Sequence, residues 1–133
     1  MNRFTLTKAE RICNKKQFEV LLNSKHTYVS YPIRVIFNYT EATEDIKYNA
    51  SIAVSVGKKR FKRAVKRNRV KRLIRESYRL HKPEFYDKIK DYHVDLLFVF
   101  VGKDLPDYAE IDHSMNILLC KICDKIVRNE HSE

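Results

Sequence analysis

The sequence predicts a single α+β domain over residues 1–133, a two-layer sandwich of helices on a mixed central sheet. Three observations support this class. The chain is 44% hydrophobic, which is enough for one packed core in 133 residues. Three segments show helical spacing of apolar residues, and three others show strand-like patterns. Their order is α-β-β-α-β-α, so a helical crossover must join the last two strands.

The first helix and the first strand are read from two short segments. Residues 15–25, KKQFEVLLNSK, place Phe18, Leu21 and Leu22 at the i, i+3, i+4 spacing of an amphipathic helix. Residues 32–40, PIRVIFNYT, are rich in β-branched and aromatic residues and predict a strand.

The second strand is predicted over residues 48–57, YNASIAVSVG, from its alternating pattern. Ile52, Val54 and Val56 fall on one face, which is apolar. The other face carries only small residues, which do not fill a core well. These small residues are Ser51, Ala53 and Ser55.

A basic helix is predicted next, from about residue 63 to residue 80, with Pro83 just beyond its end. One stripe at the 3.6-residue period is suited to packing: Val70, Leu73, Ile74, Ser77 and Tyr78. The opposite side carries Asn68, Arg72, Arg75 and Arg79, with Arg69 and Lys71 on the flanks.

The last strand and the last helix complete the pattern. Residues 93–102, HVDLLFVFVG, form a nearly continuous apolar run, which is typical of a strand covered on both faces. Residues 106–127 predict an amphipathic helix whose inward positions are Ile111, Met115, Leu118, Leu119, Ile122 and Ile126.

Positive charge is concentrated in residues 58–79, KKRFKRAVKRNRVKRLIRESYR. This basic segment carries 12 Lys or Arg and 1 acidic residue, a net +11, whereas residues 1–57 carry +3 and residues 80–133 carry −4. Such a localised footprint favours a nucleic-acid partner, and an anionic membrane surface is the weaker alternative. No run of 18 apolar residues predicts a membrane span, and the N-terminal residues lack the apolar core of a signal peptide.

Like charges within the basic helix repel one another. Arg69–Arg72, Lys71–Arg75, Arg72–Arg75 and Arg75–Arg79 stand at helical i, i+3 or i+4 spacing with no acidic residue expected to relieve them. This repulsion is understandable if an anion offsets it in the working state. The tripeptide Arg67-Asn68-Arg69 favours RNA among the possible anionic partners. Arg binds phosphate through a planar guanidinium group, and Asn can bond a phosphate, a 2′-hydroxyl or a base edge.

The segment FKRAVKRNRVKRLIRESYR, preceded by SIAVSVGKK, resembles the signature of the bacterial ribonuclease P protein component. The similarity extends to ERICNKKQFEVLL upstream and to VDLLFVFV and YAEIDHSMNILLCKI downstream. One departure lies at residues 60–63, Arg-Phe-Lys-Arg, where many members carry a glycine. The resemblance implies a left-handed βαβ crossover, against the usual right-handed rule.

The resemblance also implies a function. The chain would be the protein subunit of a cytoplasmic ribonucleoprotein that removes the 5′ leader from precursor tRNA. Its partners would be ribonuclease P RNA and precursor tRNA, with no membrane and no small-molecule substrate. The RNA subunit would be catalytic and would hold Mg²⁺, so the protein would need no cofactor and no catalytic residue of its own.

Two binding surfaces follow from this reading. The catalytic RNA would be held by Lys58, Lys59, Arg63, Lys66, Arg67, Asn68, Arg69, Lys71, Arg72, Arg75 and Arg79. The resemblance implies a cleft between the first helix and the sheet for the leader, lined by Phe18, Leu22, Phe37, Ser51, Ala53 and Ser55. The alternative for Phe18 and Phe37 is that both are core aromatics.

Few residues suggest chemistry by the protein itself. Cys120 and Cys123 form a lone pair without further ligands at metal spacing, so core packing is favoured over zinc. Asp87, Asp91 and Asp95 are spaced at four residues but end inside a strand. Two other functions stay open: an RNA-binding module such as a ribosomal-protein-like domain, and a protein-only nuclease, which would need clustered carboxylates.

Overall fold

The computed structural model describes residues 15–41, 50–89 and 92–131, which form three helices and four strands. The helices are α1 (Lys15–Leu22), α2 (Ala64–Lys88) and α3 (Tyr108–His131). The strands are β1 (Thr27–Ser30), β2 (Ile33–Glu41), β3 (Ala50–Val56) and β4 (Tyr92–Phe100). The predicted α-β-β-α-β-α order is confirmed, with one short strand added before β2.

The four strands make one mixed sheet in the order β1-β2-β4-β3. β2 pairs antiparallel with β1 and with β4, whereas β3 and β4 are parallel neighbours. β2 and β4 are therefore the two inner strands, and β4 joins the antiparallel part of the sheet to β3. An inner position for β4 agrees with its continuous apolar sequence.

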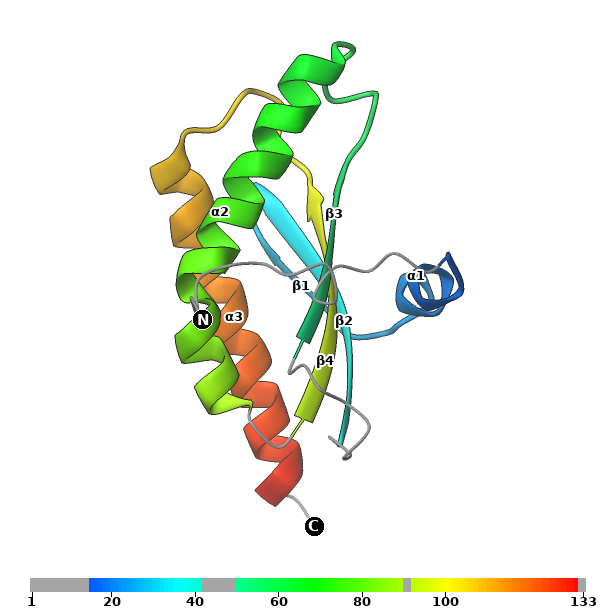
Figure 1. Cartoon of the computed structure of the whole chain (residues 1–133), viewed down its shortest axis with the longest axis vertical. Coiled ribbons are helices and arrows are strands. Elements are labelled where there is room, and N and C mark those ends of the chain that lie inside the picture. Colours follow the sequence, from blue (N-terminus) through cyan, green and yellow to red (C-terminus); the bar gives the residue numbers. More distant parts are fainter. Residues whose placement is uncertain (1–14, 42–49, 90–91, 132–133) are drawn as a thin grey trace, which may run out of the picture.

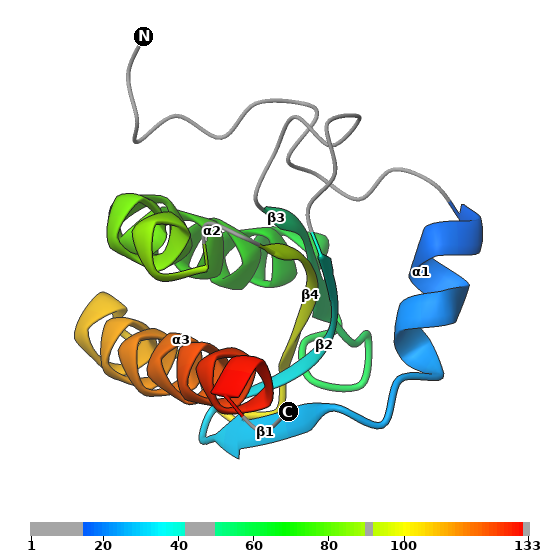
Figure 2. The same ribbon diagram turned by 90° about the horizontal axis from the view of Figure 1, so that it is seen from below.

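Helices α2 and α3 lie side by side on one face of the sheet, and the short α1 lies on the other (Figures 1 and 2). The chain leaves β3, returns along α2 and enters β4 beside β3. Seen in the two views together, this path turns in the left-handed sense, so the handedness implied by the family resemblance is confirmed.

Alternating residues divide the apolar side chains between two clusters. The larger core lies between the sheet and the helices α2 and α3, and its strand residues include Ile52, Leu96 and Phe98. A small cluster under α1 consists of Leu21, Ile36 and Leu97, with Phe18, Ala53 and Val99 packed against it. All six inward positions predicted for α3 are buried.

Strand β1 was not predicted. It is only four residues long, TYVS, and its side chains alternate between exposed and half-buried positions at the edge of the sheet. Thr27 pairs with Ile36, and the Thr27 hydroxyl donates a hydrogen bond to the Val35 carbonyl at 3.0 Å. Its strand conformation depends on this pairing with β2 more than on its own short sequence.

The predicted end of the basic helix is wrong. α2 continues to Lys88 and contains Pro83 in its interior. An interior proline costs about 3 kcal/mol. Phe85 and Ile89, which are 2% and 1% exposed, are buried beyond it. Each such side chain contributes roughly 1.5–3 kcal/mol on burial, so together they offset the cost of the proline.

Candidate nucleic-acid interface

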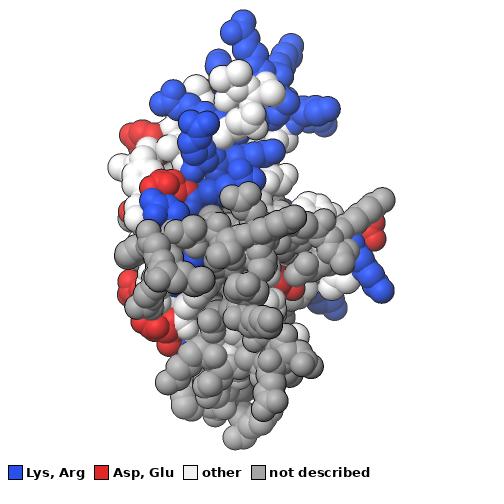
Figure 3. Space-filling view, in the orientation of Figure 1, with Lys and Arg blue, Asp and Glu red and all other residues white. Residues whose placement is uncertain are grey.

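The first turns of α2 and the loop before them carry the exposed basic side chains. β3 ends at Val56, and α2 begins at Ala64, so residues 57–63 and the helix start project together from one end of the sheet (Figure 1). Lys and Arg gather at this end in the space-filling view (Figure 3). Among the predicted RNA-binding residues, the exposed ones are Lys58, Lys59, Arg63, Lys66, Asn68, Arg69, Arg72 and Arg75, while Lys71 is half-buried.

Packing fixes the direction in which these cations point. Val70, Ile74, Ser77 and Tyr78 are buried, and Leu73 is partly buried against the main core, so the predicted packing stripe is confirmed. Side chains on the opposite side of a helix must then face solvent. The row of arginines is therefore held outward by the core.

Arg69 and Arg72 border an open hollow on the surface of α2. The hollow is also lined by Val65, Asn68 and Leu73. Val65 is 79% exposed, an unusual position for a valine on a helix surface. The hollow thus combines two guanidinium groups, an amide and apolar surface, which suits a phosphate together with its sugar.

Arg67 does not point into solvent like its neighbours. Its Nη1 donates hydrogen bonds to the carbonyl oxygens of Phe61 and Lys62, at 2.7 and 2.9 Å. Phe61 is in turn buried and stacks on Phe100 with ring centroids 5.8 Å apart. Arg67 therefore braces the loop that leads into α2, a role that its place in the Arg-Asn-Arg motif did not predict.

The loop before α2 turns without the glycine that many family members carry there. The loop turns through a hydrogen bond from the Arg60 amide to the Gly57 carbonyl at 3.0 Å. No residue in the described ranges has a positive φ. The sequence Arg-Phe-Lys-Arg is therefore accommodated in the loop without the conformation that favours glycine.

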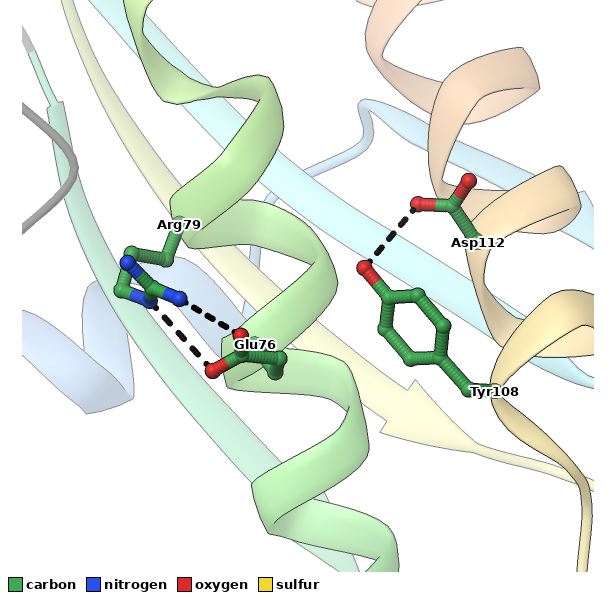
Figure 4. A network of polar contacts seen from close by, with 4 residues as sticks. All are labelled: Glu76, Arg79, Tyr108 and Asp112. Carbon is green, nitrogen blue, oxygen red and sulfur yellow. Dashed lines mark hydrogen bonds and ion pairs between the residues drawn. The ribbon is translucent and has the colours of Figure 1, made fainter.

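Arg79 has an acidic partner, contrary to the sequence expectation. Its guanidinium donates from Nε to Glu76 Oε2 at 3.3 Å and from Nη2 to the other carboxylate oxygen (Figure 4). The hydrogen bonds from Glu76 raise the pKa of Arg79 above its ordinary value. The net positive charge available to an RNA is therefore weighted toward the N-terminal half of α2.

Separate substitutions can distinguish the RNA-facing arginines from the bracing one. Arg69→Ala with Arg72→Ala should weaken RNA binding and change the free energy of unfolding by less than about 0.5 kcal/mol, because both side chains are exposed. Arg67→Ala should lower the free energy of unfolding by about 1–3 kcal/mol, because two carbonyls lose their donor. Urea denaturation and titration of labelled RNA measure the two effects. If the double variant binds RNA normally, Arg69 and Arg72 do not contact RNA and belong only to the solvated surface of the helix.

Asp112 of α3 fastens the basic helix to its neighbour. Ser77 donates to Asp112 Oδ1 at 2.9 Å, and Nε2 of His81 lies 2.9 Å from the same oxygen. The Tyr108 hydroxyl approaches it at 3.5 Å (Figure 4). Partial burial acts to raise the pKa of Asp112, but the hydrogen bonds from Ser77 and His81 outweigh it and leave the pKa below its usual range.

The lowered pKa of Asp112 predicts a pH-dependent contribution to stability. Because the folded pKa lies below the unfolded value, the contribution is complete above about pH 5 and is lost as pH falls through the folded pKa. Asp112→Asn, which imitates the protonated carboxyl, should lower the free energy of unfolding by about 0.5–1 kcal/mol at neutral pH, since the carboxylate is partly exposed. Denaturant melts from pH 7 to pH 2 should show this difference closing. Asp124→Asn, exposed on the same helix, is the control, and a constant difference across pH would contradict the assignment.

The predicted face of small residues lies beneath α1. Across this face, β3 pairs in parallel register with β4, and β4 pairs antiparallel with β2. One row consists of Ala53, Leu97 and Ile36, on which Phe18 and Leu21 of α1 pack. The rows on either side consist of Ser51, Asp95 and Asn38, and of Ser55, Val99 and Arg34.

α1 packs against β2 and β4, which leaves the β3 side of this face less covered. Phe18, Ala53 and Ser55 are half-buried there, while Leu22 is 51% exposed and Ser51 is almost fully covered. Phe18, Leu22, Ala53 and Ser55 are therefore the predicted leader-binding residues with accessible surface.

The prediction that Phe37 lines this cleft is wrong. Phe37 is 0% exposed and belongs to the larger core on the opposite face of the sheet. Side chains alternate along a strand, so Ile36 faces α1 and Phe37 faces α3. No nucleotide base can stack on Phe37, and the core interpretation is correct for this residue.

The cysteines and aspartates considered as chemical groups do not come together in one site among the described residues. Cys123 packs in the core, where burial raises the pKa of its thiol to about 11, while Cys120 is exposed. Asp95 lies 3.1 Å from Nε2 of His93, Asp87 is exposed on α2, and Asp91 lies outside the described residues. Within the described ranges, no three His, Cys, Asp or Glu side chains are grouped to hold a metal ion, and no helix could cross a membrane.

The fold is a small α+β domain whose crossover helix is rich in arginine. One side of this helix packs on the core, and its arginines face solvent on the other side. This combination is that of an RNA-binding protein. The model of the family described as Ribonuclease P matches residues 6–123 of this chain. The ribonuclease P protein component of Porphyromonas gingivalis is 37% identical over 125 residues, which cover 92% of this chain and 90% of that protein. The component from Dictyoglomus thermophilum is 32% identical and covers 94% of both chains. The chain belongs to the ribonuclease P protein family.

Solved structures agree with this assignment. A Staphylococcus aureus RNase P protein, described as a mutant with defective mRNA degradation activity, superimposes with a TM-score of 0.67 at 25% identity, covering 86% of this chain and 89% of that one. The RNase P protein of Thermotoga maritima gives a TM-score of 0.66 at 19% identity, covering 84% and 96%, and supports the fold. The alternative of a ribosomal-protein-like module gains no support from these matches.

Proposed function

We propose that this chain binds ribonuclease P RNA through the N-terminal half of α2 and assists removal of the 5′ leader from precursor tRNA. The observation that carries the proposal is the row of exposed cations, Lys66, Arg69 and Arg72, whose helix is fixed by a buried stripe on its other side. Because the core already fixes the helix, these cations can meet phosphates without the backbone first having to be ordered.

The proposed division of labour between protein and RNA rests on membership of the ribonuclease P protein family. The catalytic RNA would hold Mg²⁺, which activates the attacking water. The protein would neutralise phosphates where the catalytic RNA and its substrate, both polyanions, approach each other. Such a protein needs no nucleophile or general base of its own, and we place its activity in the cytoplasm, where tRNA is matured in bacteria.

The leader would lie across the face beneath α1. The half-buried ring of Phe18 offers a surface on which a base can stack, and Leu22 extends it. Ala53 and Ser55 provide a floor low enough for a single strand to approach the sheet. Ser51 lies on the same face of β3 but is almost fully covered, so we expect it to contact the leader least.

Reconstitution tests the proposed function. With a bacterial ribonuclease P RNA and precursor tRNA at low Mg²⁺, the protein should stimulate leader release well above the level of the RNA alone. The protein without RNA should give no cleavage at any Mg²⁺ concentration, because the described residues hold no grouped metal ligands. Cleavage by RNA-free protein would overturn the division of labour. Absence of stimulation would overturn the proposed function.

A further inference from the structure

We propose a second RNA contact, on the edge of the sheet farthest from the basic helix, that binds unpaired nucleotides by stacking. It consists of His26, Tyr28, Tyr39, Lys121 and Lys125, here called the aromatic–lysine surface. The proposal rests on the proposed function, since it requires that the chain work in contact with RNA.

The aromatic rings of this surface form one continuous stack around Phe37. The ring of His26 lies 5.4 Å from those of both Phe37 and Tyr39, and the ring of Tyr28 lies 5.6 Å from Phe37. Phe37 itself is fully buried, whereas His26, Tyr28 and Tyr39 are all half-buried. The buried ring is thus a rigid base for three partly accessible rings with polar edges.

Lysines from α3 flank these rings. The Lys121 ammonium lies 5.8 Å from the centre of the Tyr28 ring. Lys125 follows Lys121 by four residues on α3, so the two lysines lie on the same side of the helix. Burial lowers the pKa of His26, and the positive charge of Lys125 lowers it further. His26 therefore contributes a neutral ring, and the lysines contribute the charge that a phosphate requires.

The combination favours unpaired RNA over an apolar protein partner. Stacking on aromatic rings beside cations is how proteins bind single strands without reading their sequence. Tyr28 and Tyr39 pack against the main core, but they and His26 remain half-buried, so part of each side chain is accessible to a nucleotide. The cations match a phosphate backbone in charge.

The position of the surface extends the RNA-binding area of the molecule. β1 and β3 are the two edges of the sheet, and α3 packs on β1 and β2, whereas α2 packs on β3. Figure 2 shows β1 and the C-terminal half of α3 on the side away from β3. A nucleotide bound here would not compete with one bound at the start of α2 or beneath α1.

Photocrosslinking in the assembled complex tests the inference. Two separate arms of the experiment carry 4-thiouridine either in ribonuclease P RNA or in precursor tRNA. Each complex is irradiated with the full-length protein, and the adducts are located by peptide mass spectrometry. Adducts on His26, Tyr28 or Tyr39 are expected in at least one arm, and that arm identifies the source of the nucleotide. Lys121→Gln with Lys125→Gln should reduce them several-fold, while Lys88→Gln, an exposed lysine on α2, should not.

The outcomes separate this inference from the proposed function. Adducts on residues 58–79 without any on His26, Tyr28 or Tyr39 would overturn the second contact and leave the first intact. Adducts on neither region would overturn both. Aromatic-surface adducts that persist unchanged in the double lysine variant would overturn the assigned role of Lys121 and Lys125.

Discussion

Replacing Phe37 by alanine is expected to lower the free energy of unfolding by about 3–5 kcal/mol. The ring is 0% exposed and contacts the rings of His26, Tyr28 and Tyr39 at centroid distances of 5.4, 5.6 and 6.3 Å. Removing it leaves a cavity between β2 and α3 and takes away the support of three neighbouring rings. Urea denaturation followed by circular dichroism measures the loss.

Two comparisons make this expectation specific to core packing. Phe37→Leu keeps most of the buried volume and should cost less than the alanine variant. Phe18→Ala should cost less stability, because Phe18 is only half-buried, but should lose about 1–3 kcal/mol of leader affinity if a base stacks there. If the Phe37→Ala protein has normal stability but impaired leader binding, Phe37 is not a core residue and instead lines the leader-binding cleft.

The error over Phe37 has a physical cause in the sequence of β2. Alternation identified both faces of β3, because Ile52, Val54 and Val56 are apolar and the residues between them are small. In β2, Val35, Ile36 and Phe37 are all apolar, because this strand is covered by α1 on one face and by α3 on the other. Periodicity cannot then assign a ring to a face, and only the pairing of β2 with its neighbours does.

Arg67 and Pro83 show the same limit in the basic helix. The helical period located the packing stripe from Val70 to Tyr78, but all arginines in the segment look alike in sequence. The carbonyls of Phe61 and Lys62 that Arg67 binds become available only once Phe61 is buried against Phe100. Pro83 was expected to end the helix by local preference, and tertiary packing of Phe85 and Ile89 overrides that preference.

The number of exposed cations on α2 and in the loop before it determines how strongly the affinity for RNA depends on salt. Seven of the predicted RNA-binding cations are exposed on the N-terminal half of the helix and in the loop before it: Lys58, Lys59, Arg63, Lys66, Arg69, Arg72 and Arg75. Arg67 is committed to two carbonyls, and Arg79 is paired with Glu76. About five phosphates are therefore a reasonable number for this surface to neutralise, and each neutralised phosphate releases counterions on binding.

Raising monovalent salt from about 50 to about 200 mM should weaken the affinity for ribonuclease P RNA by on the order of 10² to 10³. Five phosphate contacts give a slope of roughly −3.5 to −4.5 when log affinity is plotted against log salt, the lower magnitude applying to single strands. Titration of labelled RNA at four salt concentrations measures this slope. Arg69→Ala and Arg72→Ala should each flatten it by about one unit, whereas Glu19→Gln and Glu110→Gln, outside the basic segment, should leave it unchanged. A slope near zero would mean that the cations of α2 do not meet phosphate, and the concentration of charge in residues 58–79 would then require an anionic membrane or an acidic protein partner.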